Sequence, residues 1–456
     1  MGAEFAPRAF ANLATRDAEM RIDKTVGLKR QRLLDAVNHR TPDRVPMDFG
    51  GSAVTGMHVS CVAKLRDHYG LARRRVKVIE PFQMLGLIED DLREAMGIDV
   101  TPLSGRTTMF GFENRDWRPW VFNGLEVLVP EGFRTTVEPG KGGTLLYPKG
   151  DLRARPSGYM PKDGFFFDAI IRQKPIDLDH LDPFDNTEQY VKLTDAELDG
   201  IEADARAVST GEYAVFASLV NTNLGDIAFV PGPDLIDPKG VRDVAEWYML
   251  TASQPDVVHK IFERQVEVGL ANLAKINARV GKAIDVIFLC GADFGTQTSS
   301  FCSVRTFDAL WKPHYAALCD WIHKNTTWKV FKHSCGSSER FFESMIDAGI
   351  DIINPVQCSA KGMDPRRLKD KYRGRLVFWG GGVDTQRTLP FGTPAEVRAE
   401  VLERCEIFAE GGGFVFTSIH NVQAGTPVEN IVAMIEAVKE FNGEPRASPR
   451  RAELGV

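Results

Sequence analysis

The sequence predicts an α/β fold, a (β/α)8 TIM-type barrel with a β-rich insertion in its N-terminal half. After a Pro/Asp-rich connector at residues 177–186, apolar runs alternate with amphipathic helical stretches, as βα units around a parallel sheet do. The length of 456 residues suits one such barrel with insertions. Across residues 110–167, glycines, prolines and aromatics separate short β-type runs, which indicates antiparallel strands.

Composition excludes several classes of protein. Hydrophobic residues make up 43% of the chain and charged residues 26%, as in soluble globular proteins. The net charge of −6 argues against a nucleic-acid or membrane partner, and no apolar run of ~18 residues predicts a spanning helix. The N-terminal residues lack the apolar core of a secretory signal. We therefore expect a cytoplasmic monomer or homodimer with reduced thiols at its seven cysteines.

The expected organisation is one domain. Residues 24–442 form the barrel, interrupted by the β insertion at about 110–167. Residues 1–23 are mixed polar and charged and read as a flexible lead, and the Pro/Arg/Ser-rich residues 443–456 as a disordered tail.

The elements follow from periodicity and from helix-start signals. Strands are expected at residues 214–217, 286–289, 330–331, 351–354, 376–378 and 414–416, with a short strand and glycine turn at 47–51. Helices are expected at 24–38, 58–69, 88–96, 197–208, 241–249, 257–278, 306–324, 339–348, 395–409 and 428–441. Capping boxes are expected where threonine precedes glutamate by three residues, at Thr194/Glu197, Thr393/Glu396 and Thr426/Glu429. Proline is expected at the first helical position at Pro394 and Pro427.

The chemistry of a parallel βα barrel lies where its strands end. After the strand at 330–331 come His333 and Cys335, two residues apart, so both side chains point to one side if the strand continues. Imidazole and thiolate form a zinc-type ligand pair, and Gly336 permits a close turn behind them. The alternative is that Cys335 belongs to the core and that His333 is a hydrogen-bonded strand-end residue.

A third ligand is expected from the last strand. His420 follows the strand at 414–416 and would point into the same barrel mouth. Three protein ligands with an open fourth position are the arrangement of catalytic zinc. The spacing leaves Cys358 and Cys290 as alternative third ligands, although Cys290 falls within a strand and is expected to be buried.

Other strand ends supply candidate catalytic and binding residues. We expect Asp293 and Asp384 to act as catalytic groups, Asp293 as a general base or as a partner of a ligand. The glycine run that begins at Gly380 and Gly381 permits close approach by a ligand, although it is equally compatible with a tight turn. Candidate cofactor- or substrate-binding residues are Gln297, Gln357, Asn221, Gly380 and Gly381.

Taken together, these stretches resemble the uroporphyrinogen decarboxylase superfamily. The resemblance lies in residues 32–46, 291–297, 333–336, 349–357, 379–386 and 420–430. It implies a (β/α)8 barrel and one of two activities: tetrapyrrole decarboxylation, or zinc-dependent methyl transfer with methyl-corrinoid proteins. Decarboxylases of the family carry an arginine-rich motif near the first strand, where this chain has Met47 to Ser52 and no arginine. The methyltransferase branch carries H-x-C, which His333 and Cys335 match.

The resemblance therefore implies methyl transfer between a corrinoid and a small thiol, folate or methoxylated substrate. The chain departs from the branch at its later ligand, where the typical cysteine gives way to Ser418, Ile419 and His420. A neutral imidazole in place of a thiolate makes a bound zinc a stronger Lewis acid. The chain has no D-x-H-x-x-G corrinoid motif, so a corrinoid partner protein is expected. Decarboxylation of another acid and a non-catalytic binding barrel remain alternatives.

Overall fold

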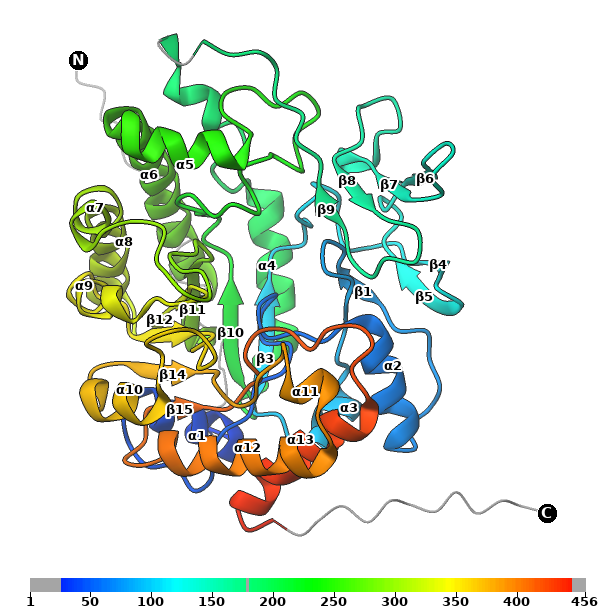
Figure 1. Cartoon of the computed structure of the whole chain (residues 1–456), viewed down its shortest axis with the longest axis vertical. Coiled ribbons are helices and arrows are strands. Elements are labelled where there is room, and N and C mark those ends of the chain that lie inside the picture. The colour runs from blue at the N-terminus through cyan, green and yellow to red at the C-terminus, as the bar shows by residue number, and fades with distance from the viewer. Residues whose placement is uncertain (1–25, 178–179, 445–456) are drawn as a thin grey trace, which may run out of the picture.

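The computed structural model describes residues 26–177 and 180–444 (Figure 1). The predicted lead at 1–23 and most of the predicted tail at 443–456 lie outside the described residues. At the centre is a curled seven-stranded parallel sheet in the order β15-β14-β13-β12-β11-β10-β3. Its strands are β3 (Val100–Ser104), β10 (Ala214–Ser218), β11 (Val286–Cys290), β12 (Lys329–His333), β13 (Ile352–Asn354), β14 (Val377–Trp379) and β15 (Phe414–Val415).

A single residue, Met47, occupies the eighth strand position and closes the sheet. Met47 forms a parallel bridge with Phe416 beyond β15, where Phe416 N–H donates to the Pro46 carbonyl at 2.8 Å. On the other side, Asp99 N–H donates to the Met47 carbonyl at 2.9 Å, just before β3. The eight positions then neighbour one another in chain order, as in a TIM barrel. The predicted fold class, with its β-rich insertion, is confirmed.

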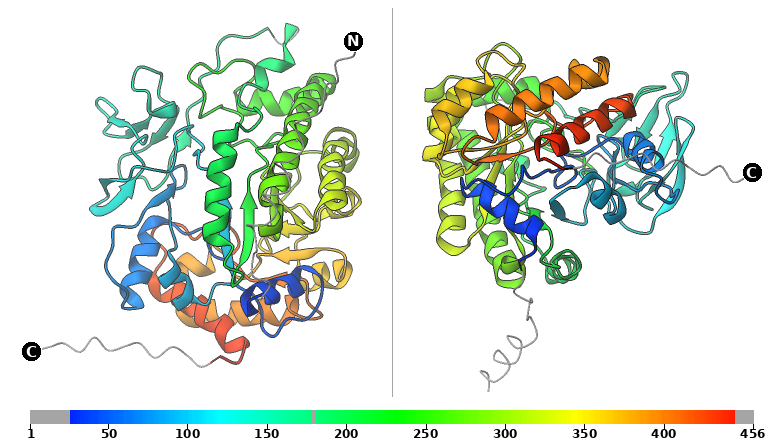
Figure 2. Two further views of the ribbon diagram at one scale, coloured as in Figure 1. Left: turned by 180° about the vertical axis from the view of Figure 1, so that it is seen from behind. Right: turned by 90° about the horizontal axis from the view of Figure 1, so that it is seen from below.

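The barrel interior is filled by side chains and closed from below by a helix. Inward-facing residues alternate along each strand, and the aromatic rings of Phe216, Phe331 and Trp379 meet at centroid distances of 4.8 to 5.6 Å. Leu33, Ala36 and Val37 of α1 (Leu28–Val37) join this buried cluster. Figure 2 shows α1 in the view from below. The amino end of the barrel is therefore plugged, and the carboxyl end is left for chemistry.

The remaining helices surround the sheet. They are α2 (Val59–His68), α3 (Asp90–Met96), α4 (Asp195–Val208), α5 (Val244–Ser253), α6 (Pro255–Val280), α7 (Val304–Leu310), α8 (Lys312–Asn325), α9 (Phe342–Asp347), α10 (Pro365–Tyr372), α11 (Thr388–Phe391), α12 (Pro394–Phe408) and α13 (Val428–Phe441). Short 3₁₀ turns lie at Pro148–Gly150, Pro183–Asn186, Gly281–Ala283 and Glu339–Phe341. No helix in the described part of the chain is both long enough and apolar enough to cross a bilayer.

The antiparallel insertion stands beside the barrel (Figure 2). Its strands are β4 (Arg118–Phe122), β5 (Leu125–Val129), β6 (Thr135–Val137), β7 (Thr144–Leu146), β8 (Gly158–Met160) and β9 (Asp168–Ala169). The strands β4 and β5 form a hairpin, and β6 to β9 form a four-stranded meander. Phe110, Phe133 and Phe167 pack together with edge-to-face contacts and give the insertion its own apolar centre. A small antiparallel pair, β1 (Val78–Glu80) and β2 (Leu85–Gly86), precedes it.

Several expected elements differ from the structure. The helix expected at 306–324 is two helices, because Pro313 has no N–H to continue the ladder across Trp311. Capping boxes form at Thr194 and Thr393, but the box expected at Thr426 is wrong. There the Thr426 hydroxyl donates to the Gln423 carbonyl and Pro427 is the N-cap, not the first helical residue. Sequence periodicity also missed β3 and α10.

Barrel closure predicts a specific stability effect at Asp99, whose side chain is 0% exposed. One Asp99 carboxylate oxygen accepts hydrogen bonds from Arg32 and Arg44, and the other accepts the N–H of Met47 at 2.9 Å. We expect Asp99→Ala to lower the free energy of unfolding by about 3 kcal/mol, because buried guanidinium and backbone donors lose their acceptor. Urea denaturation measures this change.

The matched control is Asp67→Ala. Asp67 is 58% exposed, and within residues 26–177 and 180–444 its carboxylate forms an ion pair only with the exposed Arg73, at 3.1 Å. Its replacement should change stability by about 0.5 kcal/mol or less. Equal effects of the two substitutions would show that the Asp99 contacts do not hold the barrel closed.

Candidate functional site

Three potential ligands meet at the carboxyl end of the barrel. His333 ends β12, Cys335 follows two residues later, and His420 lies in the loop after β15. One ligand atom from each lies within 4.8 Å of the others, and Cys335 Sγ is 3.2 Å from His333 Nε2. The two imidazole rings have centroids 5.2 Å apart at an angle of 76°. Residues more than 80 positions apart in sequence converge because the strand ends surround one axis.

The turn behind Cys335 depends on glycine. Gly336 has φ 79°, a conformation that disfavours other residues. A Cβ at this position would also lie 2.3 Å from the backbone carbon of Gly295, in the loop after β11. The Ser337 N–H donates to the Thr296 carbonyl at 2.8 Å. The loops that follow β11 and β12 are therefore packed backbone to backbone.

The orientation of His333 is fixed by Asn354 at the end of β13. The distance between His333 Nδ1 and Asn354 Oδ1 is 2.5 Å, and Asn354 Nδ2 donates to the Trp379 carbonyl at 2.8 Å. Because the Asn354 amide nitrogen is used elsewhere, its oxygen accepts and His333 Nδ1 carries the proton. The lone pair of Nε2 then faces Cys335, as a metal ligand requires.

The second imidazole is held differently. His420 has φ 70°, and its Nδ1 accepts the Asn421 N–H at 2.8 Å. This contact places the proton of the neutral ring on Nε2, so coordination through Nε2 requires that proton to leave or to move to Nδ1. The Asn421 side chain ties the loop to the N-terminal segment through Gly56 N–H at 2.6 Å and the Ala53 carbonyl at 2.8 Å.

Two carboxyl groups lie next to the trio. Asp293 Oδ1 accepts the Cys335 N–H at 2.7 Å and lies 3.7 Å from His333 Nε2. Asp226 is close to Asp293, and burial, strengthened by the Asp293 charge, raises the pKa of Asp226 to about 6. Burial also raises the pKa of Asp293. Asp226 was missed in the sequence because it lies in an irregular loop after β10 that no periodicity places at the barrel mouth.

Burial keeps the three potential ligands uncharged in the absence of a metal. It lowers the pKa of His333 to about 4, and it lowers the pKa of His420 to about 4 with help from the neighbouring His333. The pKa of Cys335 is raised well above its usual value by burial and then by Asp293. At neutral pH the site therefore offers two neutral imidazoles and a thiol.

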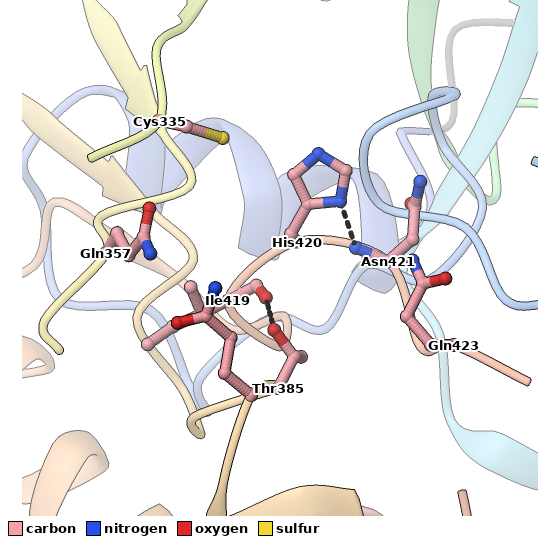
Figure 3. A pocket seen from close by; sticks show the side chains of 8 residues that line it. Cys335, Gln357, Thr385, Ile419, His420, Asn421 and Gln423 are labelled. Atoms are coloured by element: carbon pink, nitrogen blue, oxygen red, sulfur yellow. Dashed lines mark hydrogen bonds between the residues drawn. The ribbon is translucent and has the colours of Figure 1, made fainter. Parts of the chain in front are cut away.

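A cavity of about 200 Å³ opens beside the trio. It is lined by Cys335, Gln357, Thr385, Gln386, Ile419, His420, Asn421 and Gln423. Figure 3 shows the Cys335 sulfur pointing toward the His420 ring across one end of the cavity. Small-molecule sites are typically concave spaces with a few placed polar groups, and this cavity has that character.

The structure brings only part of the predicted binding set to this cavity. Gln357 lines it, whereas Gln297 is exposed and does not line it, and Gln297 Nε2 donates to Gln386 Oε1 at 2.6 Å. Asp384 is buried outside the cavity lining, and its Oδ1 accepts the Gln386 N–H at 2.7 Å. Asp384 thus orients a cavity residue.

Other predicted residues lie further away. A Cβ on Gly380 would approach the Pro355 carbonyl oxygen to 2.2 Å, and one on Gly381 would contact Phe408 and Cys358. In this structure the glycine run therefore permits packing of β14 against the chain after β13. Asn221 is exposed and does not line the cavity. Among the described residues, neither Cys290 nor Cys358 joins the trio.

Comparisons with known proteins agree with this fold. A methyltransferase from Methanosarcina mazei superposes with a TM-score of 0.51 over 91% of this chain and 98% of its own, at 16% sequence identity. At that identity the likeness shows the fold alone.

In sequence, the chain is similar to proteins named uroporphyrinogen decarboxylase. The match to that of Coxiella burnetii (strain Dugway 5J108-111) is 26% identical over 199 residues, 42% of this chain and 50% of the relative. The match to that of Anaeromyxobacter dehalogenans (strain 2CP-C) is 23% identical over 232 residues, 49% of this chain and 61% of the relative. The matched region thus spans about half the length of these relatives. A family model for uroporphyrinogen decarboxylase (URO-D) matches residues 233–441, which include all three potential ligands. The part of this chain that resembles the URO-D family is therefore its C-terminal portion, residues 233–441.

Proposed function

We propose that this protein is a zinc-dependent methyltransferase that moves a methyl group between a corrinoid and a small thiol, folate or methoxylated substrate. The observation that carries the proposal is the convergence of His333, Cys335 and His420 beside a cavity. The fold similarity to a protein named as a methyltransferase supports the same reading. The corrinoid would be carried by a partner protein that docks at the barrel mouth.

The donor set fits zinc. Zinc binds thiolate sulfur at about 2.3 Å and imidazole nitrogen at about 2.0–2.1 Å, so two ligands of a tetrahedral site lie about 3.5 Å apart. The 3.2 Å between Cys335 Sγ and His333 Nε2 is close to that separation. His420 would complete three protein ligands after its tautomer changes. The Asn354 partner of His333 supplies the hydrogen bond that zinc-bound histidines usually make.

A bound zinc would supply Lewis acidity toward the heteroatom that carries or receives the methyl group. The chain's own groups do the rest. Asp293, next to Cys335, is placed to hold a proton released in the site, and the cavity positions the substrate. Beside it, burial and then the Asp293 charge raise the pKa of Asp226 to about 6, so Asp226 can hold a proton as well.

Decarboxylation is the second candidate, favoured by the names of the sequence relatives. A polycarboxylate substrate needs cationic partners, and none of the eight residues that line the cavity is arginine or lysine. Cavity chemistry therefore favours methyl transfer.

The first test is metal content together with methyl transfer. We expect about one zinc ion per chain, and transfer from methylcobalamin to one of a panel of thiols and folates, or from a methoxylated compound to reduced cobalamin. Cys335→Ser and His420→Ala should lose the metal and lower the transfer rate by about 100-fold, because each removes a ligand. The readouts are elemental analysis and the visible spectrum of the corrinoid.

Cys358→Ser is the matched control, because Cys358 follows the cavity-lining Gln357 in the chain and does not join the trio. It should keep both metal and activity. A Cys335→Ser protein with full metal content and full activity would contradict the proposal, and release of CO₂ from a carboxylated substrate would support the decarboxylase instead.

Zinc binding should also release about one proton per ion at pH 7. The imidazoles are already neutral there, whereas the raised pKa of Cys335 means that its thiol must ionise. Apparent zinc affinity should therefore rise about 10-fold per pH unit between pH 6 and 8. Calorimetry in two buffers of different ionisation enthalpy counts the protons. Release of none would show that the thiol does not bind the metal.

Asn354 should act as a positioning residue. Asn354→Leu removes the acceptor for His333 Nδ1–H and should weaken zinc binding by about 10- to 100-fold. Competition with a chromogenic chelator measures the affinity. Asn325→Leu, at the exposed end of α8, makes the same chemical change away from the site and should leave the affinity unaltered. If the two variants bind zinc with equal affinity, Asn354 does not position His333 for the metal.

A further inference from the structure

Two glutamine side chains of the cavity wall have their oxygens anchored by the protein. Gln357 Oε1 accepts the Gly336 N–H at 2.7 Å, and Gln386 Oε1 accepts from Gln297 Nε2 at 2.6 Å. A carboxamide has one oxygen and one NH₂ group. When a protein donor holds the oxygen, the NH₂ group is the end that remains available to a ligand. In both residues the NH₂ end is left over.

These NH₂ groups have no acceptor among the described residues. Each is a donor at a cavity that the protein does not fill; Gln357 is only 7% exposed, whereas Gln386 is exposed at the rim of the cavity. Figure 3 shows Gln357 beside Cys335, on the side of the cavity opposite His420 and Gln423. The largely buried Gln357 side chain presents its donor to the cavity and not to a protein acceptor, which points to a ligand that supplies one.

Two other polar side chains of the wall already have partners in the protein. The Asn421 amide is used by Gly56 N–H, the Ala53 carbonyl and Gln83, and the Thr385 hydroxyl donates to the Ile419 carbonyl. None of the lining residues is a carboxylate, lysine or arginine. The wall therefore offers anchored donors to a ligand and no anchored anionic acceptor.

We propose that this cavity binds a hydrogen-bond-accepting oxygen group, a carboxylate or a carbonyl, through the Nε2 amides of Gln357 and Gln386. A volume of about 200 Å³ lies below the about 300–1,000 Å³ of sites for drug-sized ligands, so the molecule is small. The assignment of this group to the methyl donor or acceptor rests on the proposed function. There, the amide pair would hold one end of the substrate while its heteroatom faces Cys335 and the two histidines.

The subsite predicts a ranking among three probes of one shape: benzoate, benzamide and benzylamine. In the full chain with a chelator present, benzoate and benzamide should bind, whereas the benzylammonium ion, which carries only donors, should not. Comparison of benzoate with benzamide distinguishes a carboxylate from a carbonyl preference. Isothermal titration calorimetry measures all three. Benzylamine binding as tight as that of benzoate would overturn the proposal.

Variants test the two amides directly. Gln386→Met removes the NH₂ donor, and Gln357→Glu removes it while keeping an oxygen for the Gly336 N–H. Each should weaken benzoate binding by about 10-fold or more, and Gln357→Glu should also strengthen benzylamine binding. A merely structural defect would not reverse the charge preference.

Gln423→Met is the matched control, because Gln423 lines the same cavity and no donor in the described part of the chain holds its carboxamide oxygen. It should change benzoate affinity by about 2-fold or less. Unchanged affinity in both test variants, or an equal loss in the control, would overturn the subsite. Since binding is measured without metal or methyl transfer, loss of the subsite and loss of the methyltransferase proposal are separate results.

Discussion

The closure of the parallel barrel through Met47 is the constraint on which the site depends. This single residue joins β15 to β3, and Asp99 holds it through both backbone and side chain. Because the sheet closes with all strands parallel, every strand releases its loop at the same rim. Side chains from β12 and from the loop after β15 can therefore meet at the axis of the barrel, although these two strands are not neighbours in the sheet.

A chain of hydrogen bonds at that rim connects His333 to side chains of the neighbouring strands. His333 contacts Asn354, Asn354 donates to the Trp379 carbonyl, and the Trp379 indole donates to Asp48 at 2.9 Å. Below these hydrogen bonds the interior is aromatic and aliphatic. Strand register fixes these contacts, so the position of His333 follows from main-chain pairing. His420 has no such support and depends on a loop tied by Asn421 to the N-terminal segment.

The sequence predicts the fold and the trio better than it predicts the cavity. Alternating apolar runs and H-x-C at a strand end are local patterns, and parallel topology turns them into spatial neighbours. The role of Gln386 depends on a contact with Gln297 in a different loop, which no spacing encodes. Asp226 was missed for the same reason. The glycines Gly380 and Gly381 suit either a nearby ligand or a tight turn, and only the structure shows that Pro355 packs against Gly380 and Phe408 against Gly381.

The contact between Gly295 and Gly336 limits how this active-site rim can diversify. A methyl group on either residue would collide with the other loop's backbone, at 2.5 Å from Ser337 nitrogen or 2.3 Å from Gly295 carbon. Single substitutions at these two glycines are therefore blocked. As a result, the distance between Asp293 and Cys335 stays fixed while other parts of the rim change. Changes in substrate preference must then come from other residues of the cavity wall, outside this pair of interlocked loops.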